Sequence, residues 1–402
     1  MEAAKIIATL TRTVGDVGLA EDLAQEALVD ALTRWPDTGV PRNAGAWLTT
    51  VAKRKAIDHW RRQDNLDTKY ATLARELETR IDEPAWDPDR IDDDVLRLIF
   101  ISSHPVLSRE GQIALTLRVV GGLTTDEIAG AFLSSTPTIA ARITRAKKTL
   151  AAADVRFEVP DRSEFPQRLS AVLSVIYLIY NEGYSASSGQ RWIRDELCSE
   201  ALRLSRVLAA LVPDEPEAHG LVSLMEFQSS RFGARTHADG TPILLEDQDR
   251  TKWDRAQIGR GVTALERAAV AVEKRGSGWG PYALQAALAE CHATAPTSAD
   301  TDWDRIVLLY DGLIQVARSP VVELNRAVAV AMASGPEAGL AIVDGLTGLD
   351  GSYLLPSVRG ELLARLGRND EAAAEFARAA GLADNERERE VLTDKAVRAK
   401  DD

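Results

Sequence analysis

The segment that most constrains the fold of this chain runs from Leu123 to Leu150 and reads LTTDEIAGAFLSSTPTIAARITRAKKTL. Thr124 and Glu127 have the spacing of a capping box, which predicts that a short helix begins there. After a three-residue turn, Thr136 can cap a second helix, and Pro137 fits its first position, where a missing N–H costs nothing. The spacing therefore predicts a helix-turn-helix.

The second helix of this segment sorts its side chains onto an apolar face and a basic face. The apolar face, with steps of three and four residues, consists of Ile139, Ile143, Ala146 and Leu150. The opposite face consists of Thr138, Ala141, Arg142, Arg145 and Lys148. No acidic residue occurs from 136 to 153, so the helix can enter a major groove and neutralise phosphates. A solvated helix of an all-α domain is the alternative interpretation.

Composition bounds the class of protein. The 402 residues suffice for two or three domains. A net charge of −13 has the wrong sign for binding nucleic acid through bulk charge, so any DNA contact must come from local basic patches. Cys198 and Cys291 lie far apart and form no C-x-x-C motif, so we expect neither a disulfide framework nor a metal site or other cofactor. The chain lacks a signal-peptide pattern and a membrane-spanning apolar run, which predicts a cytoplasmic protein without membrane contact.

Acidic and proline-flanked junctions divide the chain into four parts. We expect a small helical domain at 1–63, an acidic linker at 64–92 and the helix-turn-helix domain at 93–155. Helical patterns separated by Gly and Pro follow, and they predict one large helical domain at 163–402. Because alternation of β-branched residues is rare, the expected fold is all-α, with two small domains followed by a large one.

The helix expected at 44–62 interleaves aromatic and basic residues, with Asp58 as its only acid. The aromatic and basic residues are Trp47, Lys53, Arg54, Lys55, His59, Trp60, Arg61 and Arg62. Such a surface suits contact with a nucleic-acid backbone while bases stack or flip. Two plainer interpretations stay open: Trp47 and Trp60 can be core residues, and Asp58 can pair with Arg54 one turn earlier.

The preceding helix, expected at 19–35, has an acidic polar side. This side carries Glu21, Asp22, Gln25, Glu26 and Asp30. Acidic side chains repel phosphates, so the surface cannot bind DNA, but it can dock a basic helix of another protein. An ordinary solvated face would give the same pattern.

The order of these segments resembles that of a bacterial RNA polymerase sigma factor of the extracytoplasmic-function (ECF) type. The matching strings are DVGLAEDLAQEALVDAL at 16–32, NAGAWLTTVAKRKAIDHWRR at 43–62 and the helix-turn-helix at 123–150. They cover most of residues 1–155. One departure is that the first helix is shortened relative to the family pattern.

The resemblance implies a role for each of the three surfaces. It implies that core RNA polymerase, through the clamp helices of its largest subunit, is docked by Asp22, Gln25 and Glu26. It implies that the opened −10 strand of promoter DNA is captured by Asn43, Trp47, Lys53, Arg54, Asp58, Arg61 and Arg62. It implies that the −35 duplex is read by Thr138, Ala141, Arg142, Arg145 and Lys148.

A pattern near the end of the chain is typical of a 34-residue tetratricopeptide repeat. It consists of Gly360, Leu363, Gly367, Ala372, Phe376 and Ala379, with a fainter copy at Val328, Gly335, Leu340 and Asp344. A simple pair of antiparallel helices would produce the same pattern. This part also resembles an ECF subgroup with a long tetratricopeptide-like extension, through IYLIYNEGYSASSG (176–189), LLEDQDRTKWDR (244–255), ADTDWDRIVLLYD (299–311) and SPVVELNRAVAVAM (319–332).

That subgroup implies that no conventional anti-sigma factor acts on the protein. We therefore expect the C-terminal domain to contact the sigma domains and to control them. The residues expected to make this contact are Asn181, Glu182, Gly183 and Tyr184. They follow a strongly apolar helix, and Gly183 would end it in a turn that exposes Tyr184 as an anchor. The alternative is that Tyr184 is a core residue.

Two other classes of protein compete with this interpretation. An enzyme is disfavoured because no nucleophile has a base at a diagnostic spacing, and the acids at 246–254 suit helix caps better than a metal site. A one-component helix-turn-helix regulator with a ligand-sensing helical domain is the stronger rival. Such a regulator has no use for the acidic helix beside the basic-aromatic helix in 16–62, so the sequence favours the sigma factor.

Overall fold

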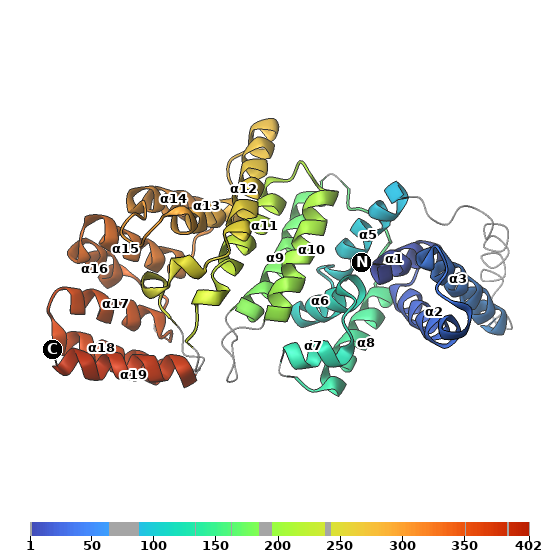
Figure 1. The fold of residues 1–402 in the computed structure, drawn as a ribbon, viewed down its shortest axis with the longest axis horizontal. Helices are drawn as coiled ribbons and strands as arrows, with labels where there is room; N and C mark the ends of the chain where they lie inside the picture. Colours follow the sequence, from blue (N-terminus) through green and yellow to red (C-terminus); the bar gives the residue numbers. More distant parts are fainter. Residues whose placement is uncertain are drawn as a thin grey trace. The chain divides into compact units, whose positions relative to one another are not determined.

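The computed structural model describes residues 2–63, 88–132, 134–161, 163–184, 195–237, 243–349, 351–383 and 386–401, with the backbone alone at 2, 61–63, 88–93, 387 and 401. Within these ranges the regular structure is helical and contains no strand, which confirms the all-α fold class (Figure 1). The chain forms two units, residues 1–179 and 180–402. Each unit has its own buried core.

The first unit contains the helices of the two small domains and the beginning of α9. Its helical elements are α1 (Glu2–Val14), α2 (Val17–Thr38), α3 (Ala44–Gln63), α5 (Pro88–Ser102), α6 (Arg109–Thr116), the π-helical turn η1 (Leu117–Gly121), α7 (Thr125–Ala131), α8 (Thr136–Ala152) and α9 (Phe165–Tyr184). The helix α1 packs on α2, α3, α5 and η1. Its apolar residues, including Ile6, Ile7 and Leu10, are almost fully buried. One short apolar helix thus joins the predicted first domain to the helices that follow the linker.

The ends of α7 and α8 agree with the predicted capping residues, with one shift. Thr124 donates its backbone N–H to Glu127 at 2.7 Å and accepts the Glu127 N–H through its hydroxyl at 3.2 Å, which is the predicted capping box. The N-cap of α8 is Ser135, whose hydroxyl accepts from the backbone N–H of Thr138. Thr136, the predicted cap, is instead the first helical residue, and its hydroxyl donates to Asp126 at 2.7 Å. The turn offers three consecutive hydroxyl residues, Ser134, Ser135 and Thr136, and the middle one caps the helix.

The helix α9 begins in the first unit and ends in the second. In the first unit, the ring of Phe165 packs on Phe100 of α5 with centroids 5.4 Å apart. Arg168 donates to the backbone carbonyl of Phe100 at 3.1 Å. The first turn of α9 therefore packs on α5, although the sequence analysis counted it with the C-terminal domain that starts at residue 163.

The second unit is a succession of helix pairs. Its helices are α10 (Asp195–Leu211), α11 (Pro216–Ser229), α12 (Arg255–Arg275), α13 (Pro281–Thr294), α14 (Trp303–Val316), α15 (Pro320–Ser334), α16 (Pro336–Gly345), α17 (Leu354–Arg365), α18 (Asn369–Leu382) and α19 (Glu386–Asp401), with the 3₁₀ turns η2 (Phe232–Ala234), η3 (Leu245–Asp247) and η4 (Arg250–Lys252). The helix α13 packs chiefly on α11, whereas from α14 onward each helix packs chiefly on its neighbours in sequence, and α17, α18 and α19 lie side by side (Figure 1). Ion pairs at a separation of 15 residues join successive helices at Glu290–Arg305, Asp311–Arg326 and Asp344–Arg359.

The residues of the predicted repeat form a helical hairpin. α17 and α18 are joined at Gly367, whose φ of 70° lies in the left-handed region. Gly360 lies against Phe376, and a Cβ on Gly360 would come within 2.9 Å of that ring. Gly335 likewise joins α15 to α16, with φ of 103°. The helix pairs are present as the pattern predicted, and their assignment to the tetratricopeptide class stays a prediction.

A close approach of α11 to α13 at a glycine generates a stability prediction. A Cβ on Gly220 of α11 would lie 2.6 Å from the backbone nitrogen of Ala283 at the start of α13. We expect Gly220→Ala to lower the free energy of unfolding by about 1–3 kcal/mol, because α13 must shift. Gly259 of α12 has no atom within 4 Å of the same position, so Gly259→Ala should raise it by about 0.5–1 kcal/mol. Urea denaturation measures the free energy of unfolding of the two variants. Equal changes in Gly220→Ala and Gly259→Ala would contradict the close approach of α11 to α13.

Candidate nucleic-acid and protein-binding sites

The basic face of α8 is exposed, as its sequence pattern predicts. Ile139, Ile143, Ala146 and Leu150 are buried, which confirms the predicted core face of the helix. Thr138, Ala141, Arg145 and Lys148 are exposed, and Arg142 is half-buried. The first turn bears small side chains and the later turns bear cations, so a duplex can approach the helix without displacing its core. DNA contact by these residues stays a prediction.

The helix α3 combines a capping residue, two tryptophans and an exposed polar face. Asn43 is its cap, and the Asn43 side chain accepts from the backbone N–H of Ala46 at 2.9 Å. Trp60 is 1 % exposed and belongs to the core. Trp47 is half-buried against Trp35 of α2, with ring centroids 5.4 Å apart. The core interpretation is therefore right for Trp60, whereas Trp47 keeps part of its ring accessible.

The polar face of α3 has exposed groups of both signs. Arg54 and Asp58 are exposed, and no ion pair joins them in the part of the chain that the structure describes. Lys53 is half-buried. The side chains of Arg61 and Arg62 lie outside the described residues. The predicted −10 set thus has Asn43, Trp47, Arg54 and Asp58 at least partly open to a ligand.

The acidic face of α2 continues into an exposed apolar patch. Asp22 and Glu26 are exposed and Gln25 is half-buried. One turn further along the same face, Val29 is 60 % exposed and Leu32 is 77 % exposed. Sequence analysis missed both apolar residues. The sequence contained a signal for them. They lie three and six residues after Glu26, so they share its face and not the buried face of Leu23, Ala27 and Ala31.

An apolar patch rimmed by acids is typical of a protein-binding surface. Within the described residues, Lys55 of α3 lies 3.4 Å from Glu26 and 3.3 Å from Asp30. These two ion pairs hold the acids of α2 beside α3 but leave the Glu26 side chain 60 % exposed. A partner with a basic and apolar helix would find complementary groups on α2 over three turns.

Glu21, which the sequence placed on the acidic outer side, is buried and joins three elements. Its side chain is 4 % exposed. Arg118 of η1 donates to it at 2.7 Å, and Lys147 of α8 donates to its second oxygen at 2.6 Å. Lys147 also lies 3.1 Å from Asp22. The carboxylate therefore ties the predicted first domain to the predicted helix-turn-helix domain in the free chain, and Asp22 takes part in the same cluster.

A second buried carboxylate joins α1 to α5. Asp94 is 1 % exposed and accepts from Arg12 at 2.8 Å and from Arg97 at 2.7 Å. Burial raises the pKa of Asp94, and the two guanidinium groups beside it oppose that rise. The two arginines together donate to both oxygens of this buried carboxylate. The packing of α1 across the linker is thus fixed by polar as well as apolar contacts.

In the second unit, the residues predicted to contact the sigma domains lie in the last turn of α9. The helix does not end at Gly183 but continues through Tyr184. The Tyr184 hydroxyl donates to Gln228 at 2.7 Å, its ring stacks on Tyr180, and Arg235 lies 3.6 Å above the ring centroid. The expectation of a turn that exposes Tyr184 was wrong, because this ring is held between helices of its own unit.

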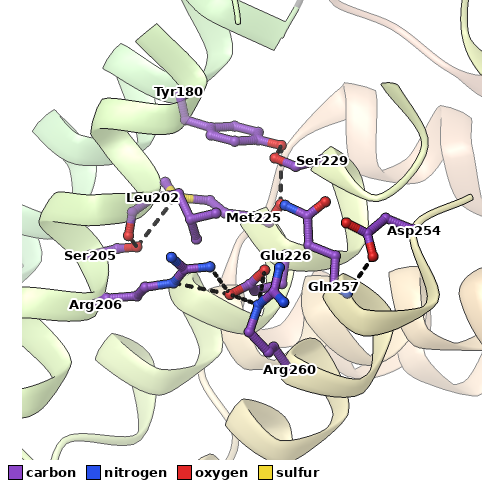
Figure 2. Close-up of polar contacts among 10 residues, drawn as sticks. All are labelled: Tyr180, Leu202, Ser205, Arg206, Met225, Glu226, Ser229, Asp254, Gln257 and Arg260. Carbon is purple, nitrogen blue, oxygen red and sulfur yellow. Dashed lines mark hydrogen bonds and ion pairs between the residues drawn. The ribbon is translucent and has the colours of Figure 1, made fainter. Parts of the chain in front are cut away.

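A buried carboxylate in the second unit is shared by two arginines. Glu226 of α11 is 1 % exposed, and Figure 2 shows Arg206 of α10 and Arg260 of α12 converging on it. Arg260 Nε lies 3.3 Å from both carboxylate oxygens. Nearby, Tyr180 and Ser229 share a hydrogen bond of 2.8 Å. These contacts pin α9, α10 and α12 to α11, and both guanidinium groups border an open groove of about 1110 Å³.

Two of the acids considered for an enzyme site, Asp249 and Asp254, act as caps. Asp249 accepts from the backbone N–H of Thr251, and Asp254 caps α12 through Gln257. Among the residues that the structure describes, no group of His, Cys, Asp and Glu is arranged to hold a metal ion. Cys198 and Cys291 are free and buried, and burial raises the pKa of the Cys198 thiol to about 12. None of the described helices combines the length and apolar content that a membrane crossing requires.

Comparison with known proteins assigns two parts of the chain. Residues 2–66 match Sigma-70 region 2, and residues 168–269 match a family of unknown function (DUF6596). An uncharacterized protein of Rhizobium meliloti (strain 1021) is 45 % identical over 383 residues, which cover 94 % of this chain and 89 % of that protein. No solved structure matches the chain. The region 2 match spans α1, α2 and α3, the helices that carry the acidic-apolar and basic-aromatic surfaces.

The Glu21 cluster generates a second stability prediction. Removing one partner of a buried ion pair leaves uncompensated charge, so Glu21→Ala should lower the free energy of unfolding by about 3–5 kcal/mol. Glu26→Ala on the same helix removes an exposed pair and should cost at most about 1 kcal/mol. Denaturant titration followed by circular dichroism compares the two. A double-mutant cycle with Lys147→Met should give a coupling energy near zero if the contact between α2 and α8 does not form.

Proposed function

The chain belongs to one family with the Rhizobium meliloti protein and has a sigma-70 region 2 at its N-terminus, and we propose that it is a sigma factor of the ECF type. It binds core RNA polymerase and directs promoter-specific transcription initiation. The region 2 match carries this proposal, because it covers the α2 and α3 surfaces together. That match points to a transcription factor without catalytic activity.

The geometry of α2 supports polymerase binding. Asp22, Gln25 and Glu26 offer acceptors to a basic helix, and Val29 and Leu32 add an apolar area that a solvated surface would not need. Core polymerase is the partner that a region 2 surface would meet. Because Lys147 pairs with Asp22 in the free chain, the docking set is partly engaged before polymerase arrives.

The geometry of α3 and α8 supports promoter binding. On α3, the −10 strand would meet Asn43, the accessible part of Trp47, Lys53, Arg54 and Asp58, with Arg61 and Arg62 next in sequence. On α8, the −35 duplex would meet the exposed face from Thr138 to Lys148. Aromatic and basic groups on α3 suit stacked, opened bases, and the small first turn of α8 suits a major groove.

We further propose that the helical second unit is tetratricopeptide-like and controls the activity of the first. Hairpins that pack on their neighbours in sequence support this, since such arrays build concave binding surfaces. The proposed control requires contact with the sigma domains and no separate anti-sigma factor. Asn181, Glu182, Gly183 and Tyr184 stay the proposed contact residues. The packing of Tyr184 on Gln228 and Arg235 means that such contact would use its ring edge or its neighbours.

A one-component regulator is the second candidate, and the exposed face of α8 would serve it equally well. Such a regulator binds duplex DNA and needs no polymerase-docking surface. The acidic-apolar face of α2 disfavours it. Purification of the full chain with core polymerase therefore separates the two candidates.

Transcription in vitro tests the proposed function. Core polymerase with the full chain should start run-off transcripts at a promoter with −10 and −35 elements. A chain that ends at residue 179, which keeps Phe165 and Arg168 on α5, should start fewer transcripts because the controlling unit is missing. Duplex binding without any transcript, with active core enzyme present, would refute the sigma-factor function.

The matched variants for that assay are Leu32→Asp and Leu308→Asp. Both leucines are strongly exposed, 77 % on α2 and 69 % on α14, so neither change disturbs a core. Leu32→Asp should weaken core-polymerase binding about tenfold or more, which corresponds to roughly 1.4 kcal/mol at one anchor residue. Leu308→Asp should bind and transcribe as the parent chain does. Equal polymerase affinity of the two variants would exclude the α2 patch from the interface.

Promoter binding by α8 gives a separate prediction. Arg145→Ala removes an exposed cation from the basic face, so the slope of log affinity against log salt concentration should fall by about one if Arg145 meets a phosphate. If Arg145 reads a base, affinity should drop by about 1–3 kcal/mol at one promoter position. Arg156→Ala, an exposed arginine beyond the end of α8, is the control. Identical binding curves for the two variants would place the DNA on another surface.

A further inference from the structure

A cavity of about 290 Å³ lies inside the second unit and is unrelated to the surfaces described above. Its walls come from η3 and the preceding Leu244, from the end of α13, the start of α14, and from α15, α17 and α19. An engineered cavity of about 150 Å³ binds benzene. The space is therefore large enough for a substituted ring or a bicyclic molecule.

The walls of this cavity are mainly apolar. The apolar side chains are Leu244, Leu245, Trp303, Val328, Met332, Val358 and Leu362. An aromatic wall beside a flexible thioether accommodates a flat ring on one face and an irregular edge on the other. Apolar walls with a few polar groups are what small-molecule sites have in common.

Four polar side chains of the cavity have no hydrogen bond within the described residues. These are the imidazole of His292, the indole N–H of Trp303 and the hydroxyls of Ser298 and Ser357. Burial, together with the nearby charges of Arg231 and Arg250, lowers the pKa of His292 to about 4. At neutral pH the imidazole is therefore uncharged and offers one donor and one acceptor to the cavity.

Among the charged side chains that line the cavity, Arg250 has no carboxylate at ion-pair distance in the described residues. Arg365 lies 3.2 Å from Glu246, and Lys395 lies 2.8 Å from Glu361, so these four charges balance. Arg250 is 8 % exposed and donates only to neutral oxygens, the carbonyls of His292 and Ala295 and the hydroxyl of Thr301. A buried cation of this kind favours an anion nearby.

We propose that this cavity is a binding site for a small aromatic carboxylic acid. The ring lies against Trp303 and Met332, and the carboxylate lies toward Arg250 and Lys395. His292, Ser357 and the Trp303 indole supply the hydrogen bonds that orient the ligand. The apolar walls favour an aromatic ring, and Arg250, which has no ion-pair partner among the described residues, favours a carboxylate. The polar side chains without hydrogen bonds favour a polar substituent on the ring.

This inference goes beyond the proposed function, since binding does not require polymerase or DNA. A ligand held by η3, α13, α15, α17 and α19 joins segments that are far apart in sequence. It would therefore stabilise the packing of the second unit by mass action. If the second unit controls the first, such a ligand is the signal that it reads.

Calorimetric titration of the full chain with indole-3-acetate and phenylacetate tests the site, with indole-3-acetamide as the neutral counterpart. We expect at least one acid to bind and the amide to bind at least tenfold more weakly than indole-3-acetate. Lys395→Gln should weaken acid binding severalfold, whereas Lys400→Gln, an exposed lysine on the same helix, should not. Equal binding of acid and amide would refute the charge selection.

A cavity-filling variant locates the binding. Ser357→Trp should abolish acid binding while the circular dichroism spectrum stays that of the parent chain. Unchanged acid affinity in Ser357→Trp, or no heat with either acid, would overturn the proposal. Because the assay contains no polymerase, a failed transcription test leaves this result untouched, and a failed titration leaves the sigma-factor function untouched.

Discussion

The buried carboxylate of Glu21 is the interaction on which the arrangement of the first unit depends. It lies on α2 and is satisfied only by cations from η1 and α8, about a hundred residues further along the chain. A desolvated charge of this kind tolerates no loss of either partner. The segments before and after the acidic linker are therefore held in one unit with a defined contact. A sigma factor that must later stretch across two promoter elements would have to exchange this contact for contacts with polymerase and DNA.

The second unit obeys a different constraint, the close approach of helix backbones. Gly220 against α13, Gly339 against α15 and Gly360 against Phe376 are positions where even a methyl group would collide. Alanines occupy many of the other buried positions, as at Ala327, Ala372 and Ala379. Small residues let helices pack closely with little volume to fill, so the unit builds many helices from few large side chains. The polar cluster at Glu226 then fixes which helices lie beside α11.

Much of the local structure was predictable from the sequence, because capping and periodicity act over a few residues. The capping box at Thr124, the buried face of α8 and the hairpins at Gly335 and Gly367 follow from such short-range rules. What could not be predicted depends on contacts between distant residues. Glu21 has the same pattern position as a solvated acid, and only Arg118 and Lys147 reveal its burial. Tyr184 ends an apolar helix and precedes a small-residue segment, yet Gln228 and Arg235 hold its half-buried ring against its own unit.

The sequential packing of α14 to α19 has a consequence for the order in which these helices fold. Each helix finds its main partner within about thirty residues, so few contacts require the closure of long loops. Chains with such local contacts fold quickly, and each hairpin can pack as it leaves the ribosome. Within the described residues α19 packs chiefly on α18, so it can open without disturbing the rest of the array. The array is thus a structure that can be built and opened from its end, one helix at a time.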